Sequence, residues 1–271
     1  MAPEGTKGRK PARISEMNIE AYLQRINYSG SLEPTAETLR ALQVAHLKTV
    51  PFENLSIHAK EPIVLEENAL FAKIVERRRG GYCYEANGLF AALLRALGFE
   101  VAMLAAGVAK KEGGFGPKFD HMTLMVTLAA ERWLADVGFG DSFLEPLLLD
   151  SREEQVQGSR AFRIVDDGDH LIMMRRHAGS DWEPQYRFTL EPYTFPDYEE
   201  TSIWHQTSPD SHFTKNRICS LATDDGRVTL SDMRLITTSG AEQLRDERTL
   251  TQEEYDRILL DQFGIVMKTS N

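Results

Sequence analysis

The chain has 271 residues, enough for one large domain or for two or three small domains packed together. Hydrophobic residues make up 42% and charged residues 27%, which is typical of a globular protein. The 31 Lys and Arg against 41 Asp and Glu give a net charge of −10, which argues against a general nucleic-acid-binding protein because that function requires a basic face. An anionic small molecule is still compatible with this charge, since a local group of Lys and Arg can hold phosphates.

Residues 1–16 are predicted to form a disordered tail, because they are rich in Pro, Gly and basic residues and contain no apolar segment. A transit peptide is the alternative interpretation. Two cysteines are too few for a disulfide framework, which favours a reducing compartment. The most apolar stretch, 89–109, is interrupted by charged residues and glycines, so it predicts a helix and a strand and not a membrane span. We therefore expect a cytoplasmic protein.

Residues 17–99 are predicted to form a helical bundle. Apolar residues recur there at three- and four-residue spacing, which is typical of helices with one buried face. The predicted helices are 18–26, 35–48, 68–77 and 88–97. Thr35 is a start signal for the second helix, and Gly98 is an end signal for the fourth.

From residue 100 the apolar period changes to that of strands. The segment 100–200 is predicted to contain strands at 101–108, 122–128, 132–137, 161–165, 170–176 and 182–190. Because no helices separate these strands, we expect an antiparallel sheet or a small barrel. The segment 201–271 is predicted to mix strands at 228–230 and 233–238 with a helix at 252–263. Thr251 and Glu254 form a possible capping box for that helix.

The stretch 79–87, Arg-Gly-Gly-Tyr-Cys-Tyr-Glu-Ala-Asn, places Cys83 after a Gly-Gly turn and before an apolar helical segment. A helix N-terminus favours a thiolate through its free N–H groups and its dipole. We therefore interpret Cys83 as a candidate nucleophile, although a lone cysteine beside a helix is more often a small buried hydrophobe. Arg79 and Glu85 are expected to form a structural ion pair, and Asn87 is expected to bind backbone groups near Cys83.

His121 is the strongest candidate base among the seven histidines, because it opens an apolar strand after a Gly-rich loop. Asp136 follows at the end of the next predicted strand, and two adjacent antiparallel strands could bring these side chains together. An imidazole can take the thiol proton and a carboxylate can fix its tautomer, so the three residues fit a Cys83–His121–Asp136 triad. The alternative is that the histidine is structural and the aspartate forms a turn before Val-Gly.

Four separated motifs resemble those of the arylamine N-acetyltransferase family. Residues 51–55 resemble its Pro-Phe-Glu-Asn motif, and residues 79–87 match its signature Arg-Gly-Gly-x-Cys-x-Glu-x-Asn. Residues 121–124 and 133–140 match the segments that carry the family's histidine and aspartate. A weaker similarity covers residues 204–213, and the resemblance extends from about Tyr22 into the C-terminal segment.

The resemblance implies an α+β fold with a helical bundle, a central antiparallel β-barrel and a C-terminal α/β lid, around a papain/transglutaminase-like cysteine core. It implies ping-pong transfer of acetyl from acetyl-CoA, through an acetyl-thioester on Cys83, to arylamines, arylhydroxylamines or arylhydrazines. No metal, nucleic acid or membrane is implied. The expected role is xenobiotic metabolism, with an endogenous amine as the open alternative.

Contacts to the two substrates are expected from two groups of residues. Water must be kept from an acyl-enzyme, and the candidate wall residues are Phe52, Phe139 and Phe213. The alternative role for each of them is core packing. The loop 110–118 could bind CoA through its lysines and through the backbone of Gly113 and Gly114. An exposed hairpin without a ligand is the alternative for this loop.

Two other functions are left open by the sequence. The first is a papain- or transglutaminase-like cysteine hydrolase or acyltransferase, but Cys83 lacks the papain-type Cys-Gly-Ser-Cys-Trp context. The second is a metal-binding module with Cys83, His121 and Asp136 as ligands, which no close Cys/His spacing supports. His205 and His212 are a weaker metal suggestion, with a solvated surface as the alternative.

Overall fold

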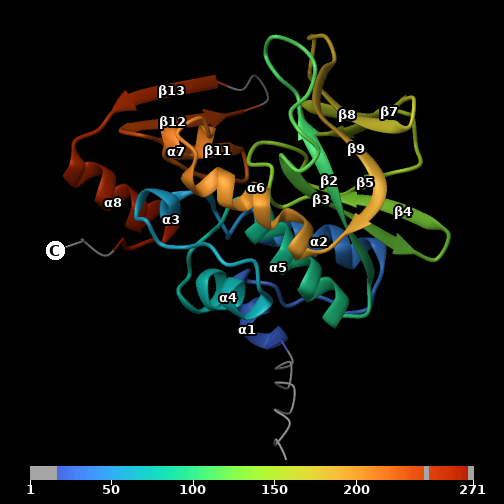
Figure 1. Cartoon of the computed structure of the whole chain (residues 1–271), viewed down its shortest axis with the longest axis horizontal. Helices are drawn as coiled ribbons and strands as arrows, with labels where there is room; N and C mark the ends of the chain where they lie inside the picture. The colour runs from blue at the N-terminus through green and yellow to red at the C-terminus, as the bar shows by residue number, and fades with distance from the viewer. Residues whose placement is uncertain (1–16, 241–243, 268–271) are drawn as a thin grey trace, which may run out of the picture.

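The computed structural model describes residues 17–240 and 244–267, so the predicted tail 1–16 lies outside the described residues. Figure 1 shows three parts: helices from the first third of the chain, a strongly curved sheet from the middle, and a second sheet with helix α8 from the C-terminal third. This arrangement confirms the predicted α+β architecture. Within the described ranges, no helix is both long enough and apolar enough to cross a membrane.

The first third of the chain is helical, as predicted. Its elements are α1 (Ile19–Arg25), α2 (Ala36–Leu47), α3 (Leu55–His58), α4 (Glu67–Phe71), the π-helix η1 (Ala72–Glu76) and α5 (Cys83–Ala96). The Thr35 hydroxyl accepts a hydrogen bond from the Thr38 N–H at 3.2 Å and so caps α2. Residues 83–94 of α5 are buried all round, because this helix packs against β2 and β3 on one side and against α4 and α6 on others. The predicted start at residue 88 is therefore too late by five residues.

The middle of the chain forms an eight-stranded antiparallel sheet in the order β5-β4-β3-β2-β9-β8-β7-β6. Its strands are β2 (Glu100–Val108), β3 (His121–Leu128), β4 (Glu131–Ala135), β5 (Leu147–Leu148), β6 (Gln155–Gln157), β7 (Arg160–Asp167), β8 (His170–His177) and β9 (Glu183–Tyr193). All six predicted strands are present. The sheet curls around a core that includes Leu104, Phe162 and Phe188. The short strands β5 and β6 escaped prediction because two or three residues are too few to show a period.

The two edge strands of this sheet are joined through glutamine side chains. Gln155 Oε1 accepts from the Leu148 N–H at 2.7 Å, and Gln155 Nε2 donates to the Leu148 carbonyl at 3.1 Å. Gln157 adds a bond from its Nε2 to the Glu145 carbonyl at 2.7 Å. The barrel is therefore nearly closed, with side-chain amides in place of a backbone ladder along the last seam.

The C-terminal part contains a second antiparallel sheet in the order β1-β10-β11-β12-β13. The strands of this sheet are β1 (Phe52–Glu53), β10 (Ile218–Ala222), β11 (Gly226–Ser231), β12 (Arg234–Ser239) and β13 (Leu244–Thr249). The helices of this part of the chain are α6 (Phe195–Thr207), α7 (His212–Lys215) and α8 (Gln252–Phe263). The predicted bounds of α8 and its Thr251–Glu254 capping box are confirmed. Every residue of β13 is exposed, which explains why no apolar pattern revealed this strand.

Strand β1 connects the first third of the chain with the last. Phe52 and Glu53 pair with Ser220 and Cys219 of β10, and Phe52 also forms a bridge to Gly81. The turn before Cys83 therefore lies against the edge of the C-terminal sheet. Helix α6 crosses in front of α5 between the two sheets (Figure 1).

Candidate active site

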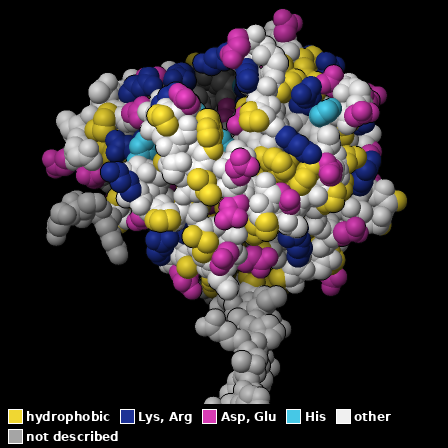
Figure 2. All heavy atoms as spheres, in the orientation of Figure 1, with side chains coloured by type: hydrophobic (Ala, Val, Ile, Leu, Met, Phe, Trp, Pro, Cys, Tyr) yellow, Lys and Arg dark blue, Asp and Glu magenta, His cyan; other side chains and the backbone are white. Residues whose placement is uncertain are grey.

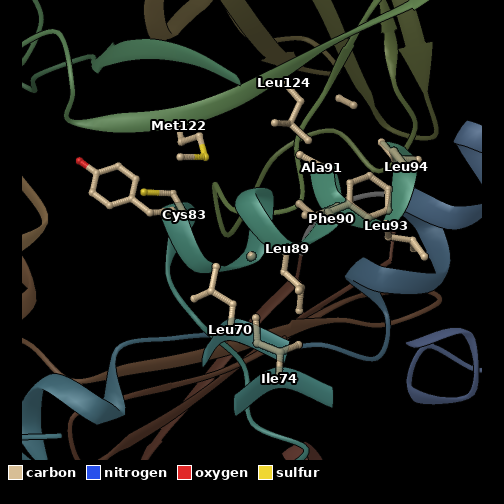
Figure 3. Close-up of a cluster of buried hydrophobic side chains, with 14 of the residues drawn as sticks. Leu70, Ile74, Cys83, Leu89, Phe90, Ala91, Leu93, Leu94, Met122 and Leu124 are labelled. Atoms are coloured by element: carbon tan, nitrogen blue, oxygen red, sulfur yellow. The ribbon is translucent and has the colours of Figure 1, made fainter. Parts of the chain in front are cut away.

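Cys83 is the first residue of α5, directly after a turn that only glycine can form. A Cβ atom on Gly80 would lie 1.8 Å from the Pro51 carbonyl oxygen, so the backbone of this turn packs directly on the segment before β1. Glu85 Oε2 accepts from the Tyr82 N–H at 3.2 Å, and this bond holds the start of the helix. The Cys83 side chain points from α5 toward β3 and lies beside Met122 (Figure 3).

Strands β3 and β4 position the other two candidate catalytic residues. His121 is the first residue of β3, and Asp136 directly follows β4, which pairs with β3. His121 Nε2 lies 2.7 Å from Asp136 Oδ2, and both side chains are almost fully buried. Cys83 also lies close enough to this imidazole to raise its pKa. The structure therefore brings together the thiol, the imidazole and the carboxylate that the sequence singled out.

The imidazole of His121 is held in its protonated form. Burial lowers the pKa of His121, but the charge of Asp136, the hydrogen bond to it and the contacts with Cys83 outweigh burial and raise the pKa to about 10. Because Nε2 donates to the carboxylate, Nδ1 is left for the sulfur. At neutral pH the site therefore presents an imidazolium to the thiol, which is the charge state that favours a thiolate.

Asn87 binds backbone groups near Cys83, as expected, and it also binds the carboxylate of Asp136. Its Nδ2 donates to Asp136 Oδ1 at 2.9 Å and to the Met122 carbonyl at 2.6 Å. Its Oδ1 accepts from the Val137 N–H at 2.8 Å. The sequence did not predict the bond to Asp136, which forms because α5 packs against the ends of β3 and β4. Asn87 therefore ties the helix to the carboxylate.

Two residues that support the site were missed by the sequence analysis. The buried Gln43 of α2 accepts from the Asp136 N–H at 3.1 Å and donates to the Leu144 carbonyl at 3.1 Å. Tyr186 of β9 packs its ring 5.2 Å from the ring of His121. A glutamine in an amphipathic helix and a tyrosine in a strand carry no local sequence signal for such roles.

The prediction of an ion pair between Arg79 and Glu85 is wrong. Arg79 pairs with Glu53 at 2.9 Å, and Lys73 pairs with Glu85 at 2.6 Å. Burial raises the pKa of Glu53, but the charges of Lys73 and Arg79 outweigh it and hold the pKa below its usual value. The partners come from η1 and β1, which the fold brings beside the turn. All four side chains are buried, so this network is a structural support beneath Cys83.

The three predicted wall residues lie on two sides of the site, and each is partly exposed. Phe139 packs edge-on against His121, with ring centroids 5.1 Å apart. Phe52 and Phe213 contact each other at 6.3 Å, and Phe213 also lies 5.5 Å from Tyr82. A Cβ atom on Gly140 would lie 3.6 Å from the Phe52 ring, so the segment after Phe139 meets the second aromatic pair.

Gly113 and Gly114 lie in the exposed tip of the turn between β2 and β3, with φ angles of +95° and +73°. A Cβ atom on either glycine would point into open space. His205 is buried between the rings of Tyr84 and Phe213, whereas His212 is exposed. Among the residues that the structure describes, no group of three or more His, Cys, Asp or Glu side chains could hold a metal ion.

Comparison with known proteins identifies the class to which this fold and site belong. A family model described as N-acetyltransferase matches residues 35–271. The arylamine N-acetyltransferase of Mycolicibacterium smegmatis is 38% identical, with 83% of this chain and 84% of the relative covered. The corresponding protein of Escherichia coli is 33% identical, with 91% and 88% covered.

Solved structures give the same result. The arylamine N-acetyltransferase of Salmonella typhimurium superposes with a TM-score of 0.86 at 31% identity, over 93% of each chain. That of Mycobacterium marinum in complex with CoA gives 0.84 at 33% identity, over 92% of this chain and 93% of the other. The chain therefore belongs to the arylamine N-acetyltransferase family, a class of acyltransferases.

Proposed function

We propose that the protein transfers acetyl from acetyl-CoA to the nitrogen of arylamines, arylhydroxylamines or arylhydrazines through a thioester on Cys83. The proposal rests on the thiol at the first turn of α5, which lies beside His121, and on Asp136, which holds that imidazole at 2.7 Å. A CoA complex of a family member with the same fold supports acetyl-CoA as the donor.

The first half of the reaction forms the acetyl-enzyme. The Cys83 thiolate attacks the acetyl carbonyl, and the bond between that carbon and the sulfur of CoA breaks. The departing CoA thiolate takes the proton from His121 Nδ1, which leaves a neutral imidazole. One thioester replaces another, so this step is close to neutral in free energy and suits a cysteine nucleophile.

The second half returns the enzyme to its starting state. An arylamine is a weak base and therefore uncharged at neutral pH, so its nitrogen lone pair can attack the acetyl-cysteine. The amine proton passes to His121, and the bond from the acetyl carbon to Cys83 breaks to restore the thiolate–imidazolium pair. Asp136 keeps the ring oriented in both halves and stabilises its charged form.

The oxyanion and the acyl-enzyme both need protection by the surrounding residues. We propose backbone N–H groups near Cys83, at the start of α5, as oxyanion donors, each stabilising the transition state by roughly 3 kcal/mol. We propose Phe52, Phe139 and Phe213 as the walls that keep water from the thioester. The hairpin with Gly113 and Gly114 stays a proposed contact for CoA.

Mass spectrometry after incubation with acetyl-CoA tests the proposal. We expect an adduct of about 42 Da on Cys83, a matching burst of free CoA, and loss of the adduct when an arylamine is added. Cys83→Ser is expected to remove turnover, and Cys219→Ser is the matched control. Burial and the nearby Glu53 raise the pKa of the Cys219 thiol, which makes this cysteine unreactive. Release of acetate without an amine product would support the cysteine hydrolase instead.

A panel of aromatic amines, hydroxylamines and hydrazines would identify the acceptor class. A xenobiotic role predicts turnover of many unrelated aromatic amines, whereas an endogenous role predicts one strongly preferred acceptor. Both cysteines are free thiols, which suits a reducing compartment, and we propose the cytoplasm.

A further inference from the structure

Three arginines from two sheets meet at one aspartate close to the triad. Asp141 Oδ1 lies 2.7 Å from Arg160 Nη1 of β7 and 3.5 Å from Arg227 Nε of β11. Arg175 of β8 donates to the Asp141 backbone carbonyl at 3.0 Å and lies 3.5 Å from Oδ2. This aspartate therefore joins the barrel to the C-terminal sheet through guanidinium groups.

The positive charge of this cluster exceeds its negative charge. The three guanidinium side chains are only 12–16% exposed. Within the described part of the chain they face Asp141 and, 3.9 Å from Arg175 and largely exposed, Glu183. In addition, the buried Nε of Arg175 has no hydrogen-bond partner. A buried guanidinium group needs hydrogen-bond acceptors, and anions are the strongest ones, so the excess charge and the free Nε of Arg175 leave this cluster able to bind another anion.

The cluster adjoins the proposed reaction site. Asp141 is two residues after Phe139, whose ring packs on His121. Arg227, Asp136, Phe139 and Gly140 border the same narrow gap, which is too small to hold a water molecule. Figure 2 shows a hollow at the top of the molecule, where Figure 1 places the barrel and the C-terminal sheet opposite each other, and Lys and Arg side chains gather around its rim.

We propose that Arg160, Arg175 and Arg227 form an anion site that binds the phosphates of the acyl donor, an assignment that rests on the proposed acetyl-CoA-dependent function. Guanidinium groups match phosphate oxygens with paired, directed hydrogen bonds. Asp141 holds the three groups in place before the donor arrives, and its negative charge then competes with the phosphates. Such a local site allows a chain of net charge −10 to bind a strongly anionic substrate.

Calorimetric titration with CoA and with pantetheine, which shares the thiol arm but lacks phosphates, tests this site without turnover. Arg160→Gln and Arg175→Gln are each expected to lower the ratio of CoA affinity to pantetheine affinity about tenfold. Arg152→Gln, which removes an exposed arginine paired with Asp166, is expected to leave the ratio unchanged. Asp141→Asn keeps the backbone carbonyl and a side-chain oxygen that accept from the arginines but removes the competing charge, so it is expected to raise the ratio severalfold.

An unchanged ratio in both arginine variants, or weaker CoA binding in Asp141→Asn, would overturn the assignment. Thermal unfolding of each variant shows whether it is folded, and Arg175→Lys keeps the charge if the glutamine variant is unfolded. A rise in KM confined to 4-aminobenzoate, with CoA affinity intact, would assign the cluster to acceptor carboxylates. Normal acetylation of Cys83 with an unchanged ratio would refute this site alone, whereas arginine-dependent CoA binding without any acetylation would refute the proposed function alone.

Discussion

Asn87 Nδ2 donates to Asp136 Oδ1 at 2.9 Å, while the other carboxylate oxygen of Asp136 faces His121. The helix that presents the nucleophile therefore also fixes the residue that orients the base. A shift of α5 along its axis would move the thiol and would also stretch the bond from Asn87 to Asp136. Asn87 is therefore one of the contacts that keep the two ends of the proposed triad in register, together with Gln43 of α2.

Asn87→Ala should weaken both the fold and the reaction. The variant leaves the Met122 carbonyl, the Val137 N–H and one oxygen of Asp136 buried without this partner, so we expect a loss of about 2–5 kcal/mol in the free energy of unfolding. Urea denaturation measures the loss, and kcat should fall with it. A loss below about 1 kcal/mol would mean that water replaces the amide.

Asp136→Asn should leave the protein folded and nearly inactive. The amide can no longer stabilise a positive imidazole, and its NH₂ group favours the wrong histidine tautomer. We expect the rate of Cys83 acetylation to fall by about 10³-fold or more, measured from the burst of CoA released from acetyl-CoA. Near-normal activity of this variant would show that the triad assignment is wrong.

Stability should fall with alkaline pH through His121. The pKa of His121 is raised in the folded protein to about 10, whereas an unperturbed histidine titrates near about 6.5. The stabilisation is therefore fully present below pH ~6.5 and is lost progressively as the pH rises to about 10. The free energy of unfolding of the wild type minus that of Asp136→Asn, measured between pH 6 and 10.5, should decrease across this window. A difference that is independent of pH would contradict the raised pKa.

Arg79→Ala should destabilise the protein strongly without any contact to substrate. The change leaves the buried Glu53 with the Leu55 N–H at 2.6 Å and, among the described residues, with Lys73 at 3.9 Å as its one charged partner, and breaking a buried pair in this way typically costs about 3–5 kcal/mol. Arg132→Ala is the matched control, because its pair with Asp150 is partly exposed and should contribute less than about 1 kcal/mol. Equal losses in the two variants would mean that the buried network is not a special support.

The sequence singled out the three residues that meet at the candidate site because each one sits in a compact local pattern: a Gly-Gly turn before Cys83, and strands that begin at His121 and end before Asp136. It could not predict Gln43, whose contact with Asp136 joins residues 93 positions apart. Arg79 and Glu85 were paired wrongly for the same reason, since their true partners approach only in the folded chain. Strand β13 was invisible because it is polar throughout and is recognised only by its pairing with β12.

The strands of the barrel are held together more weakly along the glutamine seam than at their other edges. Elsewhere the strands are joined by backbone ladders, but the last seam depends on the side chains of Gln155 and Gln157. These amides also occupy strand edges that would otherwise be templates for pairing with a second molecule. Rupture under heat or force should therefore begin along this line, and the molecule can widen there while its remaining strand pairs stay intact.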